Sequence, residues 1–465
     1  MGVEGRTHRP VVDHGICGAC AVCFHGCPAE RVVEVRDGPD SLRGRVYRGA
    51  GSFALPVPGS PAQDPPCRAA CPLGQDVPGY LRLLAEGRIQ EALDRILEDN
   101  PLPAVCGHVC TRPCEAACTR SRIHDAVPIR TLKAFAALGG RRTPIAAVGG
   151  GPLVAVVGSG PAGLTAAHDL ARSGFRSMLI ESHNRPGGML AWAVPPFRLP
   201  REALETDIQA ILEMGVELRA GLRFGKDVGL GDLREEGIRA LLLAAGATRS
   251  LALEIPGEDS QGVVDSLAFL RRVHAGDDRP LGGRVLVVGG GSAAMDAART
   301  ARRLGSEVLV VYRRERRDMP ADPQEVEEAA AEGVAFCFLT APVRVIVDRD
   351  GRMQGLECVR TRLGEAESGA RPRPVPVPGT GHEIAGDALI TALGQAPDLP
   401  RILEALGKEH AARFRLDPES GETGLAGIFA AGDFLNGPGS VVEAMACGRR
   451  AARAVHEFLR RGGSL

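Results

Sequence analysis

Ten of the 13 cysteines lie in the first 118 residues, in two groups whose spacing is typical of metal ligation. The first group is Cys17-x2-Cys20-x2-Cys23-x3-Cys27, followed directly by a proline. Bacterial ferredoxins have this spacing, with three thiolates on one iron–sulfur cluster and the fourth available to another. Zinc is the alternative, but structural zinc sites usually pair two short cysteine knuckles across a spacer. The spacing therefore favours an iron–sulfur cluster.

A second cysteine group follows, in two parts whose members are each separated by three residues. Its members are Cys67 and Cys71, then Cys106, Cys110, Cys114 and Cys118. The ten cysteines of these two groups suffice for two clusters with four thiolates each, whereas a third such cluster would need more cysteines than the two groups contain. We therefore expect two 4Fe-4S clusters, without an assignment of each cysteine to one of them.

The remaining cysteines, Cys337, Cys358 and Cys447, stand singly in apolar segments and are expected to be buried structural residues. The total of 13 is odd, which disfavours a disulfide framework. Dense thiols without disulfides indicate a reducing compartment, so we expect a cytoplasmic protein.

Two segments, 153–182 and 284–314, share the order strand, glycine-rich turn, helix, strand. They read LVAVVGSGPAGL and RVLVVGGGSAAM at their starts and align without a gap, with Gly158 on Gly289. One such glycine motif is a weak signal. Two such motifs that align in register, each between an apolar strand and a helix, predict two dinucleotide-binding units.

In the first unit, Gly158 makes the tight turn, Gly160 lets the backbone approach a pyrophosphate, and Gly163 lets helix and strand pack closely. The N-terminus of the helix supplies free N–H groups and the positive end of its dipole. Glu181 ends the second strand, where it can accept hydrogen bonds from an adenosine ribose.

Two later segments favour a flavin in the first unit. RPGGMLAWAVPPFRLP brings a glycine pair, 187–188, directly after the ribose-binding strand. GIFAAGDFLNGPGSVVEAM ends a strand at Gly432-Asp433 and begins a helix at Ser440, which forms a capping box with Glu443. The N–H groups of that helix can support negative charge on a reduced isoalloxazine ring, and Asp433 can bind ribityl hydroxyls.

The second unit differs where the coenzyme would be recognised. Tyr312 stands in place of the ribose-binding carboxylate, and Arg313-Arg314 follow. Arginines without a carboxylate suit the 2′-phosphate of NADP(H). NADH is the alternative, because Glu315 could reach a ribose hydroxyl.

The candidate cofactor residues fall into two sets. The first unit and the two later segments contribute Gly158, Gly160, Pro161, Ala162, Gly163, Glu181, Gly187, Gly188, Met189, Arg198, Gly432, Asp433, Ser440, Val441 and Val442. The second unit contributes Gly289, Gly291, Ser292, Ala293, Ala294, Arg313 and Arg314.

The elements around these residues predict an α/β protein with a helical N-terminal region. Apolar residues recur at helical spacing from Tyr80 until Asn100-Pro101 stops the pattern. The chain has 56 Lys and Arg against 57 Asp and Glu, so no net field favours nucleic acid or an anionic membrane. No apolar run reaches the length of a membrane span.

The motifs CGHVCTRPCEAAC, VAVVGSGPAGL, GGML with FRLP, VLVVGGGSAAMDAAR with YRRERRDMPA, and GIFAAGD resemble the small (β) subunit of NADPH-dependent glutamate synthase. Related members are the electron-input domains of dihydropyrimidine dehydrogenase and of NADH-dependent ferredoxin:NADP reductase. The resemblance covers about 67–465. It implies a helical iron–sulfur domain followed by two doubly wound, Rossmann-like domains, with the NADPH domain inserted in the FAD domain. The expected boundaries are 1–50 for a ferredoxin-like extension, 51–145 for the helical domain, 146–256 and 386–465 for the FAD domain, and 257–385 for the NAD(P)H domain.

The resemblance also bears on the iron ligands. Members of this family carry a further cysteine pair shortly before the position of Cys67, and residues 51–66 contain none. The run at 17–27 then either replaces that pair or builds a cluster of its own. The family counterpart of Cys106 is not a ligand. The expected iron ligands are Cys17, Cys20, Cys23, Cys27, Cys67, Cys71, Cys110, Cys114 and Cys118.

The function implied is oxidation of NAD(P)H through FAD, with single electrons passing through the clusters to an acceptor protein or large catalytic subunit in a hetero-oligomer. Hydride transfer between the two cofactors requires no protein acid or base, so no catalytic side chain is assigned. The alternatives are a ferredoxin:NAD(P) oxidoreductase, the NAD(P)H-linked subunit of a molybdenum, tungsten or other redox complex, and a zinc-stapled, non-enzymatic interaction module. A disulfide reductase is excluded, because residues 119–336 contain no cysteine.

Overall fold

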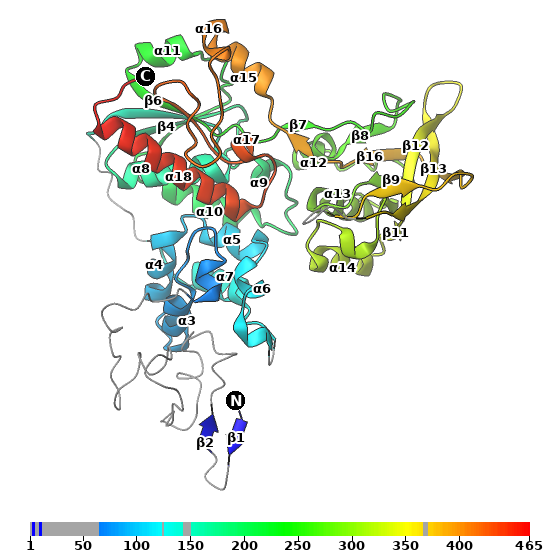
Figure 1. The fold of residues 1–465 in the computed structure, drawn as a ribbon, viewed down its shortest axis with the longest axis horizontal. Helices are drawn as coiled ribbons and strands as arrows, with labels where there is room; N and C mark the ends of the chain where they lie inside the picture. Colours follow the sequence, from blue (N-terminus) through cyan, green and yellow to red (C-terminus); the bar gives the residue numbers. More distant parts are fainter. Residues whose placement is uncertain (1, 5–8, 12–64, 123–124, 143–149, 366–370) are drawn as a thin grey trace.

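The computed structural model describes residues 2–4, 9–11, 65–122, 125–142, 150–365 and 371–465 (Figure 1). Beyond the two short antiparallel strands β1 (Gly2–Glu4) and β2 (Arg9–Val11), these residues form a helical domain and two α/β domains. The cysteine run at 17–27 lies outside the described residues. Within the described ranges, no helix combines the length and the apolar character needed to cross a membrane.

The helical domain (65–142) is a bundle of short helices around Tyr80, Ile96 and Ile129, all of which are buried. The apolar pattern before Asn100 forms two helices, because Gly87 turns the chain with φ +74°. The elements are α2 (Pro66–Ala69), α3 (Val77–Ala85), α4 (Ile89–Asp99), α5 (Pro103–Val109), α6 (Pro113–Ala116), η1 (Thr119–Arg122) and α7 (Ile129–Gly139).

The first α/β domain is built on a five-stranded sheet in the order β18-β6-β3-β4-β5, with every neighbouring pair parallel. Its strands are β3 (Leu153–Val157), β4 (Arg176–Glu181), β5 (Glu217–Ala220), β6 (Ile238–Leu243) and β18 (Ile428–Ala430). Its helices are α8 (Pro161–Arg172), α9 (Met189–Trp192), α10 (Arg201–Leu212), α11 (Leu230–Glu235), α15 (Leu399–Leu406), α16 (Lys408–Ala411), α17 (Asp433–Asn436) and α18 (Val441–Arg460). Helices α8 and α18 lie side by side against the sheet (Figure 1), and a Cβ on Gly448 would come within 2.2 Å of the Ala162 carbonyl oxygen.

The second α/β domain repeats this plan with a parallel sheet in the order β11-β10-β9-β16-β8. Its parallel strands are β8 (Val263–Asp265), β9 (Arg284–Val288), β10 (Glu307–Val311), β11 (Ala335–Cys337) and β16 (Ala388–Thr391). Its helices are α12 (Ser266–His274), α13 (Ser292–Arg303), η2 (Arg316–Asp318) and α14 (Pro323–Ala331). A small antiparallel sheet adds β12 (Thr340–Val347), β13 (Met353–Leu363), β14 (Pro374–Pro376) and β15 (His382–Ala385).

The second domain is inserted in the first. Strand β18 follows the whole second domain in the sequence, yet it belongs to the same sheet as β3. The expected boundary at residue 385 is too early, because β16 pairs with β8 and β9 of the second domain. The chain enters and leaves that domain through β7 (Arg249–Ser250) and β17 (Gln395–Ala396), which pair with each other. The second domain is therefore 251–394 in the structure.

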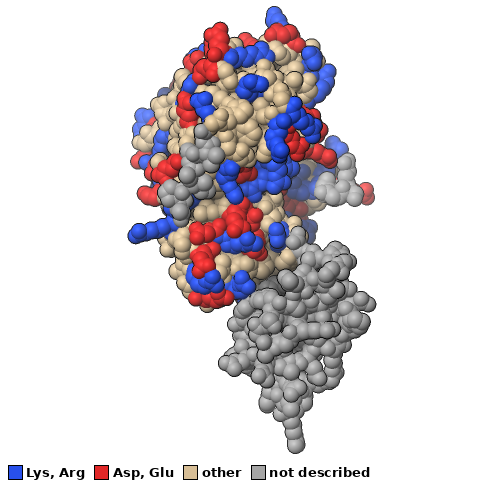
Figure 2. Space-filling model, turned by 90° about the vertical axis from the view of Figure 1, so that its left-hand side faces the viewer, with Lys and Arg blue, Asp and Glu red and all other residues tan. Residues whose placement is uncertain are grey.

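The face of the molecule in Figure 2 carries Lys and Arg side chains in small groups, interspersed with Asp and Glu. A buried junction joins the helical domain to the first α/β domain. Asp207, on α10, accepts a hydrogen bond of 2.9 Å from the Val105 N–H and pairs with Arg142. The two domains therefore share one continuous core, which includes Leu102, Val105 and Met445.

Candidate functional site

The glycine-rich turn between β3 and α8 has the geometry of a nucleotide-binding turn. Gly158 has φ +101°, and a Cβ there would come within 2.4 Å of the Ala244 carbonyl oxygen. A Cβ on Gly163 would come within 1.9 Å of the Gly158 oxygen, so the helix packs directly on the turn. A Cβ on Gly160, in contrast, would meet no atom within 4 Å and would project into open space. That space lies before the N-terminus of α8, where a pyrophosphate would meet the backbone N–H groups.

Glu181 lies at the end of β4, buried beside this turn. Its Oε2 accepts hydrogen bonds from the Ser159 hydroxyl at 2.6 Å and the Ser159 N–H at 3.1 Å, and its Oε1 accepts one from the His183 N–H at 2.9 Å. Burial opposes ionisation, but the hydrogen bonds from His183 and Ser159 outweigh it and hold the pKa of Glu181 below its usual value. A buried, ionised carboxylate therefore lies beside the turn, at the position expected for a ribose contact.

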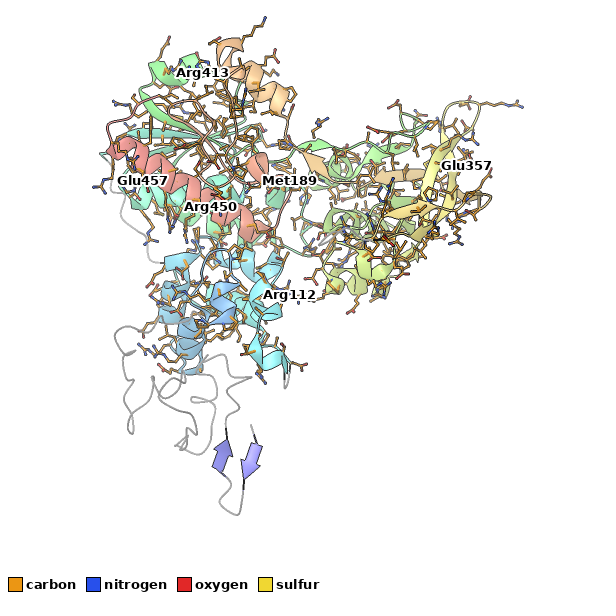
Figure 3. The ribbon with its side chains drawn as sticks, in the orientation of Figure 1. Arg112, Met189, Glu357, Arg413, Arg450 and Glu457 are labelled. Atoms are coloured by element: carbon orange, nitrogen blue, oxygen red, sulfur yellow. The ribbon has the colours of Figure 1, made fainter. Side chains whose placement is uncertain are left out.

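Both α/β domains contribute to one cavity of about 810 Å³, which is within the range of cofactor sites. Met189, labelled in Figure 3, lies in this cavity on the side of the first domain that faces the second. The predicted residues that line it are Gly158, Gly160, Pro161, Ala162, Glu181, Gly188, Met189, Arg198, Ser292, Ala293, Asp433, Ser440 and Val441. The other predicted cofactor residues, which do not line it, are Gly163, Gly187, Gly289, Gly291, Ala294, Arg313, Arg314, Gly432 and Val442.

The C-terminal wall of the cavity begins at the helix start predicted from the capping box. The Ser440 Oγ accepts from the Glu443 N–H at 3.3 Å, and the Glu443 carboxylate accepts from the Ser440 N–H at 2.8 Å, which confirms the capping box. Asp433 is half-buried on the same wall. Burial raises its pKa to about 6, with a further increase from the Glu443 carboxylate, although the Gly439 N–H stabilises the charged form.

In the second domain, Tyr312 occupies the position that Glu181 has in the first. A Cβ on Gly290 would come within 2.5 Å of the Tyr312 ring, and the Tyr312 hydroxyl donates to the Asp318 carbonyl at 2.7 Å. The phenol ring therefore fills the place where a ribose-binding carboxylate would lie. Gly289, with φ +147°, keeps the tight turn of the first unit.

Arginines gather around this tyrosine, and one of them was missed by the sequence analysis. Arg371 lies 3.4 Å from the Tyr312 hydroxyl through its Nη1. Burial, together with the guanidinium groups of Arg314 and Arg371, lowers the pKa of Arg313. The Nε of Arg314 donates to the Pro372 carbonyl at 2.7 Å, so this side chain holds the loop that carries Arg371. Arg371 lies more than 50 residues from Arg313 in the sequence, and no local pattern connects them.

Arg198 links the two domains at the cavity. Its Nη1 pairs with Asp296 on α13 at 2.6 Å, and its Nη2 pairs with Glu325 on α14. Burial raises the pKa of Asp296 to about 6, and its buried Oδ1 has no hydrogen-bond partner among the described residues. Arg198 lines the cavity as predicted, but nothing in the sequence near it indicates its two acidic partners. In the structure, this arginine fixes the second domain against the first.

The helical domain brings the second cysteine group together. Cys67 and Cys114 belong to one buried cluster with Tyr80, and helices α2 and α6 are in contact. The charges of Cys114, Cys67 and Cys71 add to burial in raising the pKa of Tyr80 well above its usual value. Cys118 follows α6 and is half-buried. The expected ligands Cys17, Cys20, Cys23 and Cys27 lie outside the described residues.

Cys106 is directed away from this group. It is 1% exposed, and its sulfur lies 3.6 Å from the Met445 sulfur on α18. Burial raises the pKa of the Cys106 thiol to about 12. These contacts support the expectation that Cys106 is not an iron ligand.

The donor set suits an iron–sulfur cluster better than a single metal ion. Among the described residues, no three His, Cys, Asp or Glu side chains converge closely enough to hold one ion. Thiols around a 4Fe-4S cluster each bind a different iron and therefore stand farther apart than the ligands of zinc. Cys71, Cys110, Cys114 and Cys118 form no disulfide within the described part of the chain, so these thiols are available for such a cluster.

The cysteine loop after α5 extends to the dinucleotide cavity. Val109 and Thr111, the neighbours of Cys110, both line it. Arg112 follows in a left-handed conformation with φ +61° and pairs with Asp322, the N-cap of α14, at 2.5 Å. Figure 3 shows Arg112 on the side of the helical domain that faces the second α/β domain. The arrangement places the loop that carries Cys110, the first-domain turn and the second-domain helix at one cavity.

The fold and this cavity define a flavoprotein oxidoreductase of the two-dinucleotide class, with an iron–sulfur domain at its N-terminus. Residues 152–448 match the model of the pyridine nucleotide-disulphide oxidoreductase family, and residues 61–142 match that of dihydropyrimidine dehydrogenase domain II, 4Fe-4S cluster. The chain belongs to the pyridine nucleotide-disulphide oxidoreductases, in the branch that includes the small chain of glutamate synthase. The cofactors of these domains are FAD, NADP(H) and a 4Fe-4S cluster.

Three relatives illustrate the similarity. The chain is 38% identical to the β subunit of an NADP(+)-dependent formate dehydrogenase from Moorella thermoacetica, over 89% of this chain and 63% of that protein. It is 38% identical to the β subunit of an NADPH-Fe(3+) oxidoreductase from Geobacter sulfurreducens, over 85% of this chain and 64% of that protein. It is 35% identical to the glutamate synthase [NADPH] small chain of Escherichia coli, over 85% of this chain and 89% of that protein. The chain thus spans less than two thirds of the first two relatives.

Solved structures share the fold. FprA from Mycobacterium tuberculosis superposes with a TM-score of 0.54 at 19% identity, over 68% of this chain and 87% of that one. A thioredoxin reductase from Lactococcus lactis does so with a TM-score of 0.51 at 24% identity, over 66% of this chain and 99% of that one. These similarities agree with the expected order of two doubly wound domains.

Proposed function

We propose that this chain is the electron-input subunit of a larger redox assembly, in which it oxidises NADPH and delivers single electrons to a partner protein. The observation that carries this proposal is the shared cavity, which the first-domain turn, the second-domain helix α13 and the Cys110 loop all line. When bound there, FAD supplies the ability to accept an electron pair from NADPH and to release it one electron at a time.

The residues of the chain bind and orient these groups. The N-terminus of α8 and the open space at Gly160 would hold the FAD pyrophosphate, with Glu181 as acceptor for the ribose hydroxyls. Gly188 faces this turn, since its Cβ would come within 2.8 Å of the Gly160 Cα. Ser440 and Val441 begin the helix whose N–H groups face the cavity and would stabilise negative charge there.

The second domain would hold NADPH with its 2′-phosphate near the arginines around Tyr312. Arg313 is exposed at the end of β10, and Arg371 lies beside the same phenol. Charge-assisted hydrogen bonds from guanidinium groups to a phosphate are among the strongest in proteins. Arg198 would keep the two coenzyme sites adjacent through Asp296 and Glu325.

The expected iron ligands of the described region are Cys67, Cys71, Cys110, Cys114 and Cys118. We propose that four of them, with Cys110 nearest the cavity, bind a cluster that accepts electrons from the flavin. A second cluster on the run at 17–27 would carry electrons onward. We also place the chain in the cytoplasm, because two dense groups of expected iron-ligating thiols favour a reducing compartment.

The partner is proposed from the names of the relatives. Two of them are β subunits, of an NADP(+)-dependent formate dehydrogenase and of an NADPH-Fe(3+) oxidoreductase, and a third is the small chain of glutamate synthase. We favour a catalytic subunit carried on a separate chain, with a ferredoxin as the second candidate. Copurification from the native host followed by identification of the associated chains distinguishes a large glutamate-forming subunit from a molybdenum or tungsten subunit.

The test of electron input uses the full chain, reconstituted anaerobically with iron, sulfide and FAD. NADPH should bleach the flavin absorbance and then produce the electron paramagnetic resonance signal of a reduced cluster. Cys110→Ser should preserve flavin bleaching and reduce the cluster signal severalfold, whereas Cys106→Ser should leave both unchanged. A chain that binds zinc but neither iron nor flavin would overturn the proposal in favour of an interaction module.

A further inference from the structure

Lys133 is a lysine inside the helical domain. It lies on α7 with its side chain 6% exposed, on the same face as the buried residues Ile129 and Ala136. The other two lysines of the chain, Lys226 and Lys408, are exposed. Hydration at the surface stabilises the charges of Lys226 and Lys408, but it does not explain how the charge of Lys133 is stabilised inside the domain.

The surroundings of Lys133 are thiols and apolar groups. Helix α7 packs closely on α5, since a Cβ on Gly107 would come within 2.7 Å of the Ala134 Cβ. Helix α7 also contacts α6, which carries Cys114, while α5 carries Cys106 and has Cys110 as its C-cap. The positive charge of Lys133 accordingly acts on these three thiols. Two of these, Cys110 and Cys114, are expected iron ligands.

Lys133 has no partner in the part of the chain that the structure describes. No hydrogen bond or ion pair to its ammonium group occurs there. The nearby carboxylate of Glu115 is engaged by the backbone N–H of Arg130, at 2.7 Å. Most of Lys133 is shielded from water although its Nζ keeps some exposure, so its charge is less well hydrated than that of a surface lysine and would be stabilised by a nearby anion.

A bound iron–sulfur cluster would supply that counter-charge. A cluster held by four thiolates carries net negative charge, and it gains one more negative charge when it is reduced. A fixed cation beside it favours the reduced state, because the attraction increases with the added charge in a medium of low dielectric constant.

We propose that Lys133 is the residue that compensates the charge of the cluster bound by Cys110 and Cys114, and that it raises the reduction potential of this cluster. The inference rests on the proposed function, since it requires a cluster at these cysteines. On this proposal, Lys133 makes electron transfer from the flavin to the cluster more favourable, so part of the driving force comes from this chain and not from the partner.

The first test is a potentiometric titration of the reconstituted full chain, followed by electron paramagnetic resonance. Lys133→Met keeps the length of the side chain and removes its charge. It should lower the equilibrium constant for cluster reduction by about tenfold, which is about 59 mV for a one-electron couple. Lys133→Arg should restore most of the potential, and Lys226→Met, at an exposed lysine, should not change it. A bound cluster with an unchanged potential in Lys133→Met, or an equal shift in Lys226→Met, would overturn the proposal.

The second test separates charge compensation from a structural role and uses the chain without iron. In the iron-free chain, Lys133→Met should raise the midpoint of urea unfolding relative to the wild type, because it removes a buried charge that lacks a counter-ion. In the reconstituted chain, the same substitution should speed the loss of iron to a chelator. Destabilisation of both forms to the same extent would show that Lys133 only packs, and the proposal would fail. Failure of the wild-type chain to bind iron would instead overturn the proposed function itself.

Discussion

The two strand–turn–helix–strand units have the same backbone plan and differ at equivalent positions. In the first unit, Glu181 ends the second strand and accepts hydrogen bonds from Ser159 and His183. In the second unit, the equivalent residue is Tyr312, whose ring lies over Gly290 and is surrounded by arginines. The comparison predicts that the glycine motif determines how the phosphates of a dinucleotide are bound, whereas the residue at the end of the second strand determines which ribose is accepted.

The contact between helix and turn also differs between the units. Gly163 lies against the Gly158 oxygen so closely that a Cβ would be 1.9 Å from it. Its equivalent in the second unit is Ala294, which is fully buried and already carries a Cβ. The first unit therefore packs its helix closer to the strand than the second does.

The largest expected effect comes from exchanging these two residues. Gly163→Ala should destabilise the first domain by about 3 kcal/mol, because a methyl group would overlap a backbone carbonyl that has no room to move. Ala294→Gly should cost only about 1 kcal/mol, the difference in helix propensity. Unfolding by urea and the FAD content of the purified chain measure both. Equal effects of the two substitutions would show that the two units pack alike.

A smaller effect is expected at the coenzyme site of the second unit. Arg313→Ala and Arg371→Ala should each raise the KM for NADPH by about ten- to hundredfold, as each removes a charge-assisted bond worth about 1.5–3 kcal/mol. The KM for NADH should stay nearly constant, because NADH has no 2′-phosphate. Steady-state reduction of a dye with both coenzymes is the measurement.

Arg317→Ala is the matched control for this experiment. Arg317 is 75% exposed and pairs with Glu315 in the same segment, so its loss should change neither KM appreciably. Equal losses for NADPH and NADH in Arg313→Ala would contradict a role in coenzyme choice and would indicate a role in folding.

The smallest effect concerns the pH dependence of stability at the first unit. The pKa of Glu181 is lowered in the folded chain, so its ionised form stabilises the fold above the unfolded pKa, and this contribution is lost as the pH falls through the folded pKa. The difference in unfolding free energy between the wild type and Glu181→Gln should be largest near neutral pH and shrink below about pH 4. Urea titrations of the flavin-free chain at several pH values measure it. The difference in unfolding free energy between the wild type and Tyr312→Phe should not vary over this pH range. A similar pH dependence in both variants would show that Glu181 and Tyr312 do not differ in this respect.

The sequence predicts best what is local. The two glycine turns, the strand that ends at Glu181 and the capping box at Ser440 each follow from a few neighbouring residues, and the structure contains all of them. The boundary near residue 386 was misplaced, because the pairing of β16 with β9 joins segments about 100 residues apart. Of the predicted residues of the second unit, Ser292 and Ala293 line the cavity whereas Gly289 and Gly291 do not, and the role of all four in binding NADP(H) stays a prediction.

Other features arise only when distant segments meet. The ion pairs of Arg198 with Asp296 and Glu325 cross a domain interface, and the approach of Arg371 to Tyr312 depends on a loop of the small antiparallel sheet. The burial of Lys133 is equally invisible in the sequence, where it reads as an ordinary helix residue. Each of these contacts depends on tertiary packing, and no repeat or residue spacing in the sequence predicts it.

The pairing of β7 with β17 has a consequence for engineering. Gln395 pairs with Ser250 and Ala396 with Arg249, so the two ends of the second domain enter and leave the first side by side. A segment whose ends are adjacent can be cut out and replaced by a short turn without stretching what remains. The coenzyme-binding part of this chain is therefore a cassette: a domain of different coenzyme preference can be spliced between positions 250 and 395, provided that it retains an acidic pair to meet Arg198.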